Sequence, residues 1–166
     1  MKPLLRQLPV TNEVPLNSPS KLKFKKSFQP VEIDDDDELF QNGIFVFNIT
    51  KLLAHIGANA SEFPIENVLV GTLGITSSNL DDAAVLKADL GTPIILAEIA
   101  PGRFNIIDGN HRVERARREG AVTLPARRVG PDCHYRFLTS VDAYRRYVEY
   151  WNEKAAATAK RARVPP

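Results

Sequence analysis

A β-hairpin that runs directly into a glycine turn and a helix is the feature that most constrains how this chain folds. The apolar run 92–100 ends at the turn dipeptide Pro101-Gly102, and a second apolar run, 104–107, follows at once. Two such runs around a turn signal predict antiparallel strands. Asp108-Gly109-Asn110 then interrupts the strand pattern, and a helix is expected over 111–119. The segment predicts a domain of the α/β (α+β) class.

Strand and helix patterns elsewhere in the chain agree with that class. Short apolar or alternating runs predict strands, and apolar residues spaced three or four apart predict helices. The expected strands cover 21–25, 44–47, 67–70 and 121–129, and the expected helices cover 50–56, 80–90 and 140–154. Asn48 or Thr50 is expected to cap the first helix and Asn79 the second. We expect a small mixed sheet with short helices and a C-terminal helix packed across it.

Three parts are expected along the chain. Residues 1–42 form a Pro-rich, charged N-terminal arm, since the prolines at its start oppose a long helix. The acidic run 34–38 within it is expected to be a solvated loop. Ordered structure is expected from Gly43, and 43–154 forms one domain that includes the C-terminal helix. Residues 155–166 form a basic tail that is expected to fray.

The sequence argues against a membrane-spanning protein, a secreted protein and a protein held together by disulfides or a cysteine-rich zinc site. No apolar run reaches the ~18 residues of a membrane span, so no membrane insertion is expected. The start of the chain predicts no secretory signal. The single cysteine, Cys133, excludes an internal disulfide and a cysteine-rich zinc site. A cytoplasmic location is therefore the expectation.

Charge is divided unevenly between the two parts of the chain. Residues 1–100 carry 8 Lys and Arg against 13 Asp and Glu, whereas residues 101–166 carry 14 against 7. Arginine outnumbers lysine 12 to 2 in the second part, and arginine makes forked contacts with phosphate. This balance indicates phosphate-bearing partners. The alternative is a solvated helical face that pairs with Asp and Glu.

The turn between the hairpin and the helix has the physical properties of an anion site. Gly109 permits a tight turn that a phosphate can approach closely. The helix that follows exposes N–H groups and the positive end of its dipole. His111 and Arg112 lie in its first turn, where cationic side chains cost stability unless an anion sits between them. The alternative is that Asp108 and Asn110 cap the helix and that the two cations are solvated.

Two carboxylates near this turn are candidates for catalysis or metal binding. Asp108 stands at the strand end, where a carboxylate can accept a proton, hold a divalent metal or orient His111. Glu98 lies on the antiparallel strand and is a candidate base or second metal ligand, or else an outward-facing strand residue. The predicted catalytic residues are Asp108, His111, Arg112 and Glu98, the predicted phosphate-binding residues are Gly109, Asn110, His111 and Arg112, and the predicted metal ligand is Asp108.

Three arginines are predicted to contact DNA phosphates without reading sequence. Arg115 and Arg118 follow Arg112 by three and six residues, so a basic stripe continues along the helix. Adjacent residues of a strand face opposite sides, so only one of Arg127 and Arg128 joins such a surface, and Arg127 is assigned to it. On this assignment, changing Arg115 and Arg118 to Ala lowers the salt dependence of DNA binding.

Residues in the C-terminal region are interpreted as structural. A Cys-His pair alone, here Cys133 and His134, has too few ligands for a zinc site. Tyr144, Tyr147 and Trp151 have helical spacing, which predicts contact with the core. The alternative for these rings is a stacking platform for unpaired bases.

The string Ile106-Ile107-Asp108-Gly109-Asn110-His111-Arg112, followed by Ala116 and Gly120, resembles the signature of the ParB/sulfiredoxin superfamily. The resemblance covers residues 43–130. It implies that a nucleotide, ATP or another nucleoside triphosphate, is bound by its phosphates at this turn and helix start, together with Mg²⁺. Sulfiredoxins carry a catalytic cysteine where this chain has Asn110, so sulfinic acid reduction is not expected. Too few residues follow Gly130 for the helix-turn-helix domain of partitioning proteins.

The aromatic stretch from Tyr135 to Asn152 is similar to that of the plasmid fertility inhibition factors within this superfamily. That similarity implies ATPase and DNase activity, sequence-independent action on transferred DNA, and contact with components of a DNA-transfer secretion machine. Two alternatives stay open. One is a non-catalytic module that senses a nucleotide and binds DNA or protein, and the other is a small-molecule kinase that uses Asp108 and His111.

Overall fold

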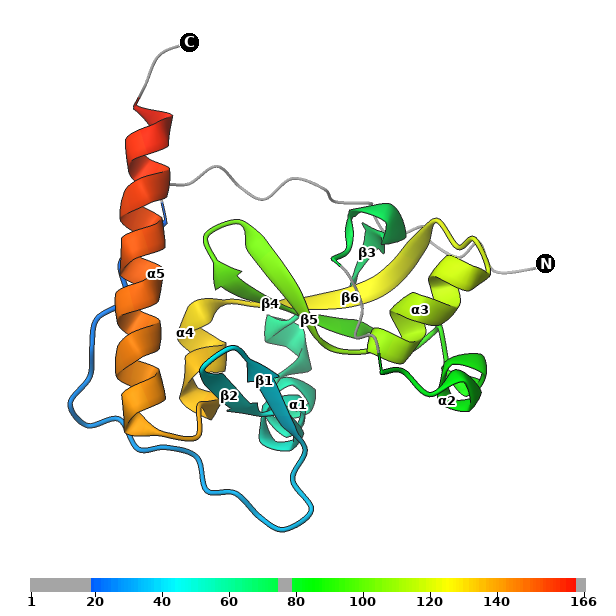
Figure 1. The fold of residues 1–166 in the computed structure, drawn as a ribbon, viewed down its shortest axis with the longest axis horizontal. Coiled ribbons are helices and arrows are strands. Elements are labelled where there is room, and N and C mark those ends of the chain that lie inside the picture. Colours follow the sequence, from blue (N-terminus) through cyan, green and yellow to red (C-terminus); the bar gives the residue numbers. More distant parts are fainter. Residues whose placement is uncertain (1–18, 75–78, 164–166) are drawn as a thin grey trace.

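The computed structural model describes residues 19–74 and 79–163, which contain a four-stranded sheet with helices on both faces (Figure 1). In spatial order the strands are β3 (Glu66–Leu69), β6 (Thr123–Val129), β4 (Ile94–Ala100) and β5 (Arg103–Asp108). β4 and β6 run parallel, and the two outer pairs are antiparallel. The predicted α/β (α+β) class, with a small mixed sheet, short helices and a C-terminal helix, is confirmed.

Strand β4 divides the core in two because its side chains alternate between the two faces of the sheet. Ile94 and Leu96 pack with residues of α3 (Asn110–Arg118) on one face. Ile95 and Ile99 belong to the apolar cluster on the other face. β4 is therefore buried on both sides, as the continuous apolar run in its sequence indicates.

The face opposite α3 is covered by a small hairpin and several helices (Figure 1). The hairpin joins β1 (Leu39–Asn42) to β2 (Phe45–Asn48). The helices are α1 (Ile49–Ala58), α4 (Pro131–His134) and α5 (Val141–Ala162), with the 3₁₀ turns η1 (Ala60–Glu62) and η3 (Tyr135–Phe137). A further 3₁₀ turn, η2 (Val70–Thr72), packs on the α3 side through Val70. Within the described residues, no helix combines the length and apolar character needed to cross a bilayer.

The core contact predicted for the C-terminal aromatic residues is confirmed. Tyr144 and Tyr147 are fully buried and Trp151 nearly so. Side chains that are buried in this way are closed to stacking by a nucleic-acid base, so the alternative of a base platform on these three rings is wrong.

The predicted N-cap is correct for the first helix and wrong for the second. Asn48 caps α1 by accepting a hydrogen bond from the Lys51 N–H at 3.0 Å. The second helix differs from its prediction. α2 covers only Asp82–Lys87, and its N-cap is Asp81, whose carboxylate accepts from the N–H groups of the first turn. The cap expected at Asn79 is wrong.

The described part of the predicted N-terminal arm does not stand apart from the domain. No strand forms over 21–25, because the backbone there bonds to side chains of α5 and not to another strand. β1 precedes Gly43, so regular structure begins earlier than expected. Residues 1–18 lie outside the described residues.

Two predictions for the C-terminal region are corrected by the structure. α5 continues to Ala162, so the fraying expected from residue 155 is wrong for this part of the tail, and Ala155 itself is buried. The polar loop expected around Cys133 is instead α4 and the turn η3, with Cys133 and His134 buried.

Candidate functional site

The Asp-Gly-Asn-His-Arg turn opens onto a shallow pocket of about 490 Å³ between α2 and the start of α3. It is lined by Ala84, Lys87, Ala88, Asp89, Thr92, Asp108, Gly109, His111 and Arg112. Three of the four residues predicted to bind phosphate, all but Asn110, therefore line one cavity. The pocket also brings in residues 84–92, which the sequence analysis did not connect with the motif.

Gly109 is required at this turn by its backbone conformation and by its surroundings. Its φ angle is 100°, in the left-handed region that only glycine adopts readily. A Cβ atom at this position would lie 2.6 Å from Cγ2 of Ile94 and 3.1 Å from Nε of Arg112. The turn is thus packed tightly against the start of β4, and this contact positions the N-terminus of α3.

The first turn of α3 presents backbone donors to the pocket. Gly109 is its N-cap and has no side chain to accept from these donors. The first internal bond of the helix runs from the Val113 N–H to the Gly109 carbonyl at 3.0 Å. Among the described residues, no acceptor is found for the N–H groups of His111 and Arg112. Such donors, at the positive end of a helix dipole, suit an anion.

Arg112 lines the pocket, but its guanidinium faces the protein. Nη1 donates to the carbonyl oxygens of Thr92 at 3.1 Å and Pro93 at 2.7 Å. Nη2 donates to Oδ2 of Asp108 at 2.8 Å. The side chain is only 13% exposed. Arg112 thus fastens the segment before β4 to the end of β5, a structural task that the sequence analysis did not foresee.

The basic side chains of the pocket that are not bonded within the described residues are His111 and Lys87. His111 is half-buried, and within residues 19–74 and 79–163 its ring has no hydrogen-bond partner. Lys87 lies in the last turn of α2, is exposed, and forms no ion pair in the same part of the chain. Lys87 was missed because it precedes the motif by more than twenty residues, and only the packing of α2 beside α3 brings it to the pocket.

Two carboxylates line the pocket, Asp108 and Asp89. Asp89 accepts from the Thr92 hydroxyl at 2.7 Å and the Gly91 N–H at 2.9 Å. These two hydrogen bonds hold the pKa of Asp89 below its usual value. In the described part of the chain, no three His, Cys, Asp or Glu side chains are placed so that they could hold one metal ion. Mg²⁺ commonly uses one or two carboxylates together with substrate phosphates, and Asp108 remains a predicted ligand on that basis.

Glu98 lies at the other end of the hairpin. Its carboxylate accepts from the Gly102 N–H at 2.9 Å, inside the turn between β4 and β5. In the strand register Glu98 stands opposite Phe104, whereas Asp108 stands opposite Ile95. Four residues of β5 separate these positions, about 13 Å along the strand. The structure does not bring Glu98 to the pocket.

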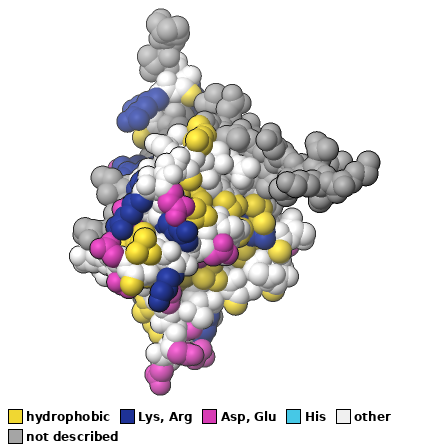
Figure 2. Space-filling view, turned by 90° about the vertical axis from the view of Figure 1, so that its right-hand side faces the viewer, with side chains coloured by type: hydrophobic (Ala, Val, Ile, Leu, Met, Phe, Trp, Pro, Cys, Tyr) yellow, Lys and Arg dark blue, Asp and Glu magenta, His cyan; other side chains and the backbone are white. Residues whose placement is uncertain are grey.

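The three arginines predicted to bind DNA are engaged within the protein. Arg115 donates to the Ala88 carbonyl at 2.6 Å and to Glu119 at 2.7 Å. Arg118 pairs with Asp82 and Glu114. Figure 2, which shows the side of the molecule where α2 and α3 lie, has basic and acidic side chains interspersed there.

Arg127 is similarly committed, since its Nη1 donates to the carbonyl oxygens of Ala60 and Phe63. It thereby ties β6 to η1. With Arg115 and Arg118 bonded to α2 and to neighbouring carboxylates, all three predicted DNA-binding side chains hold elements together. The solvated helical face paired with acidic residues, left open as an alternative, describes Arg118 well.

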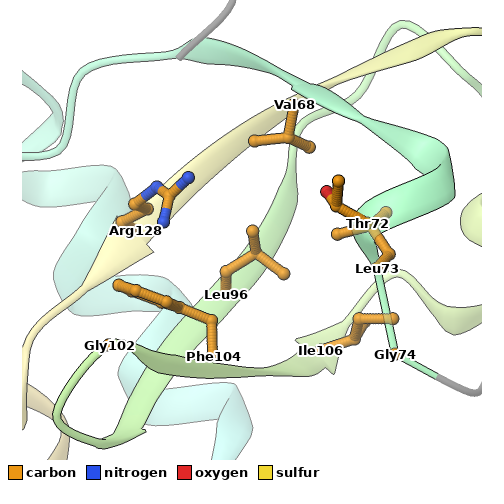
Figure 3. A pocket seen from close by; sticks show the side chains of 9 residues that line it. All are labelled: Val68, Thr72, Leu73, Gly74, Leu96, Gly102, Phe104, Ile106 and Arg128. Atoms are coloured by element: carbon orange, nitrogen blue, oxygen red, sulfur yellow. The ribbon is translucent and has the colours of Figure 1, made fainter. Parts of the chain in front are cut away.

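A second pocket, of about 220 Å³, lies over the sheet next to the β4–β5 turn (Figure 3). Its walls are mainly apolar and include Leu96, Phe104 and Ile106. Arg128 stands at its side, 4.5 Å from the centroid of the Phe104 ring and ion-paired with Glu66. It shares no lining residue with the pocket at Gly109, so the two are separate.

The chain matches no protein-family model, and neither a curated protein nor a solved structure is significantly similar to it. The resemblance to the ParB/sulfiredoxin superfamily therefore rests on the sequence motif and remains a prediction.

Proposed function

We propose that the pocket at Gly109 binds the phosphate groups of a nucleoside triphosphate, with ATP and Mg²⁺ as the expected ligands. The observation that carries the proposal is the convergence of the α3 N-terminus, His111 and Lys87 on one cavity. Backbone N–H groups, a helix dipole and cationic side chains all favour bound phosphate. No internal acceptor within the described residues competes for these groups.

The two carboxylates of the pocket are the proposed ligands of the metal ion. Asp108, with Asp89 beside it in the pocket, would hold Mg²⁺ against the phosphate oxygens. Bound there, Mg²⁺ would supply positive charge against the phosphate oxygens, and the role of Asp108 and Asp89 would be to hold it. Hydrolysis of ATP and of DNA, and a role in blocking DNA transfer like that of a plasmid fertility inhibition factor, follow from the resemblance of the aromatic stretch from Tyr135 to Asn152 and are part of this proposal.

A second candidate, a non-catalytic nucleotide sensor that binds DNA or protein, is favoured by one observation. Arg112 is committed to Asp108 and to two carbonyl groups, so it is not directed at a transferring phosphate. Glu98, the other predicted base, lies at the far end of the hairpin. Of the two predicted bases only Asp108 lines the pocket, where it is ion-paired with Arg112, so this candidate would bind phosphate without hydrolysing it.

Thermal unfolding with and without MgATP tests the binding step. A ligand at one hundred times its Kd stabilises the folded protein by about 2.7 kcal/mol, which raises the melting temperature. The variant His111→Ala/Lys87→Ala should lose this shift, whereas Lys160→Ala, on the exposed face of α5, should keep it. An equal shift in the double variant would contradict the site.

Phosphate release from ATP, measured on the same proteins, separates the two candidates. Turnover that Asp108→Asn abolishes supports the enzyme. Binding without turnover in the wild type supports the sensor.

A further inference from the structure

Residues 19–28, here called the strap, form a basic segment beside α5 (Figure 1), and its last four residues make a turn closed by a hydrogen bond from the Phe28 N–H to the Lys25 carbonyl at 3.0 Å. The strap contains four lysines, Lys21, Lys23, Lys25 and Lys26, and no acidic residue. Each of the four is exposed. None forms an ion pair within the described part of the chain. The strap therefore concentrates positive charge that forms no ion pairs among the described residues, with Lys25 alone lining a cavity that also holds Glu62 and Asp132.

The strap is held in place through its backbone. The side chain of Asn152 accepts from the Leu22 N–H at 2.8 Å and donates to the Leu22 carbonyl at 2.9 Å. The Tyr144 hydroxyl accepts from the Lys25 N–H at 2.9 Å. Further along α5, Nε1 of Trp151 donates to the Ser20 carbonyl at 2.9 Å. Because backbone groups make these bonds, the lysine ammonium groups are left for a ligand.

The lysines are arranged at a regular spacing. Lys21, Lys23 and Lys25 alternate with Leu22, which packs against the core, and with Phe24. In an extended backbone, residues two apart lie on the same side, about 6.6 Å from one another. The result is a short row of ammonium groups along one side of the strap, which suits a linear polyanion.

An aromatic residue, Phe24, stands between Lys23 and Lys25 in the sequence. Phe24 is 40% exposed and stacks on Tyr144, with ring centroids 5.3 Å apart. The guanidinium of Arg145 lies 5.6 Å from the centroid of Phe24 and forms no ion pair within the described residues. Aromatic rings beside cations are the groups on which proteins stack unpaired bases while they bind the phosphates.

We propose that the strap and Arg145 form the surface that binds single-stranded nucleic acid, independently of base sequence. The choice of nucleic acid rests on the proposed function, but the surface differs from the one expected on α3. The arginines of α3 are bonded to carbonyl and carboxylate groups, whereas the strap cations are not. The surface is also separate from the phosphate pocket, with which it shares no residue.

A salt titration of binding to a fluorescent 20-nucleotide mixed-sequence DNA, followed by anisotropy, tests the proposal. Each neutralised phosphate of a single strand contributes about −0.7 to the slope of log affinity against log salt. Lys21→Gln/Lys23→Gln should therefore reduce the slope by about 1.4. Arg118→Gln/Arg146→Gln is the matched control, since it removes the same charge from two exposed, ion-paired arginines, and it should leave the slope unchanged.

Phe24→Ala tests the stacking contact and should weaken binding of the single strand about tenfold while duplex binding stays constant. A larger effect of the arginine control than of the lysine variant would overturn the proposal. Wild-type binding to phosphatidylserine vesicles with none to DNA at 20 mM salt would overturn it in favour of a membrane surface. Neither result bears on the phosphate pocket, whose MgATP-dependent melting shift is read separately.

Discussion

Nη2 of Arg112 lies 2.8 Å from Oδ2 of Asp108, so the acidic and basic ends of the motif form an ion pair across the glycine turn. The same guanidinium reaches the Thr92 and Pro93 carbonyl groups before β4. One side chain thus joins the start of the hairpin, its end and the helix that follows. Arg112 and Asp108 therefore hold together the backbone segments that surround the pocket, and both residues also line it.

Arg112→Ala should lower the free energy of unfolding by about 2 kcal/mol, because it removes charge-assisted hydrogen bonds to three oxygens, two of them partly buried. Urea denaturation measures this loss. Arg112→Lys should recover only part of it, since an ammonium group cannot fork between carboxylate and carbonyl. His111→Ala is the neighbouring control and should stay within about 0.5 kcal/mol of wild type. Equal stability of Arg112→Ala and wild type would refute the structural role.

Gly109→Ala should destabilise the protein by about 3 kcal/mol, which combines left-handed backbone strain with a clash against Ile94. Gly102→Ala makes a matched control. Gly102 also has a positive φ, 73°, but nothing lies within 4 Å of the position its Cβ would take. We expect about 1 kcal/mol there, from strain alone. Chemical denaturation measures both losses. Similar losses in the two variants would show that the close contact with Ile94 adds nothing to the cost of Gly109→Ala.

Stability should fall as the pH is lowered below 7.5, because of His134. This side chain is fully buried, and burial lowers its pKa to about 4 from an ordinary value of 6.5. Between these values the unfolded chain takes up a proton that the folded protein does not, so about 2 kcal/mol is lost between pH 7.5 and pH 5.

Urea denaturation at pH 7.5, 6 and 5 measures the effect of His134. Asp37 and Asp89 have lowered pKa values, and the stability they contribute is lost only below about pH 4, outside this range. Imidazole resonances followed by NMR provide a second measurement. A His134 ring that titrates near pH 6.5 in the folded protein would exclude this mechanism.

Cys133→Ser should leave any ATP turnover within about twofold of wild type. Cys133 is buried and lines a different cavity from the pocket at Gly109, beside Arg136. Burial raises the pKa of its thiol, which disfavours the reactive thiolate. Phosphate release measured at equal protein concentration is the test. Lost turnover with an unchanged melting temperature would instead point to a thiol mechanism.

Local sequence was sufficient for the elements that depend on backbone preference. The β4–β5 hairpin, the Asn48 cap and the glycine turn into α3 all arise within a few neighbouring residues. Each of these features depends on propensity, hydrophobic alternation or the freedom of one glycine, and each of these acts within a few residues. The mixed α/β class follows from them.

Only the tertiary structure decided which partner each charged side chain meets. Asp89 joins Asp108 in the pocket because α2 packs beside α3, and Glu98 is excluded because strand register places it at the opposite turn. Arg115 bonds to α2, and the strap docks on α5 in place of a strand. The physical reason is that a long polar side chain takes the best acceptor within reach, and what lies within reach is set by elements distant in sequence.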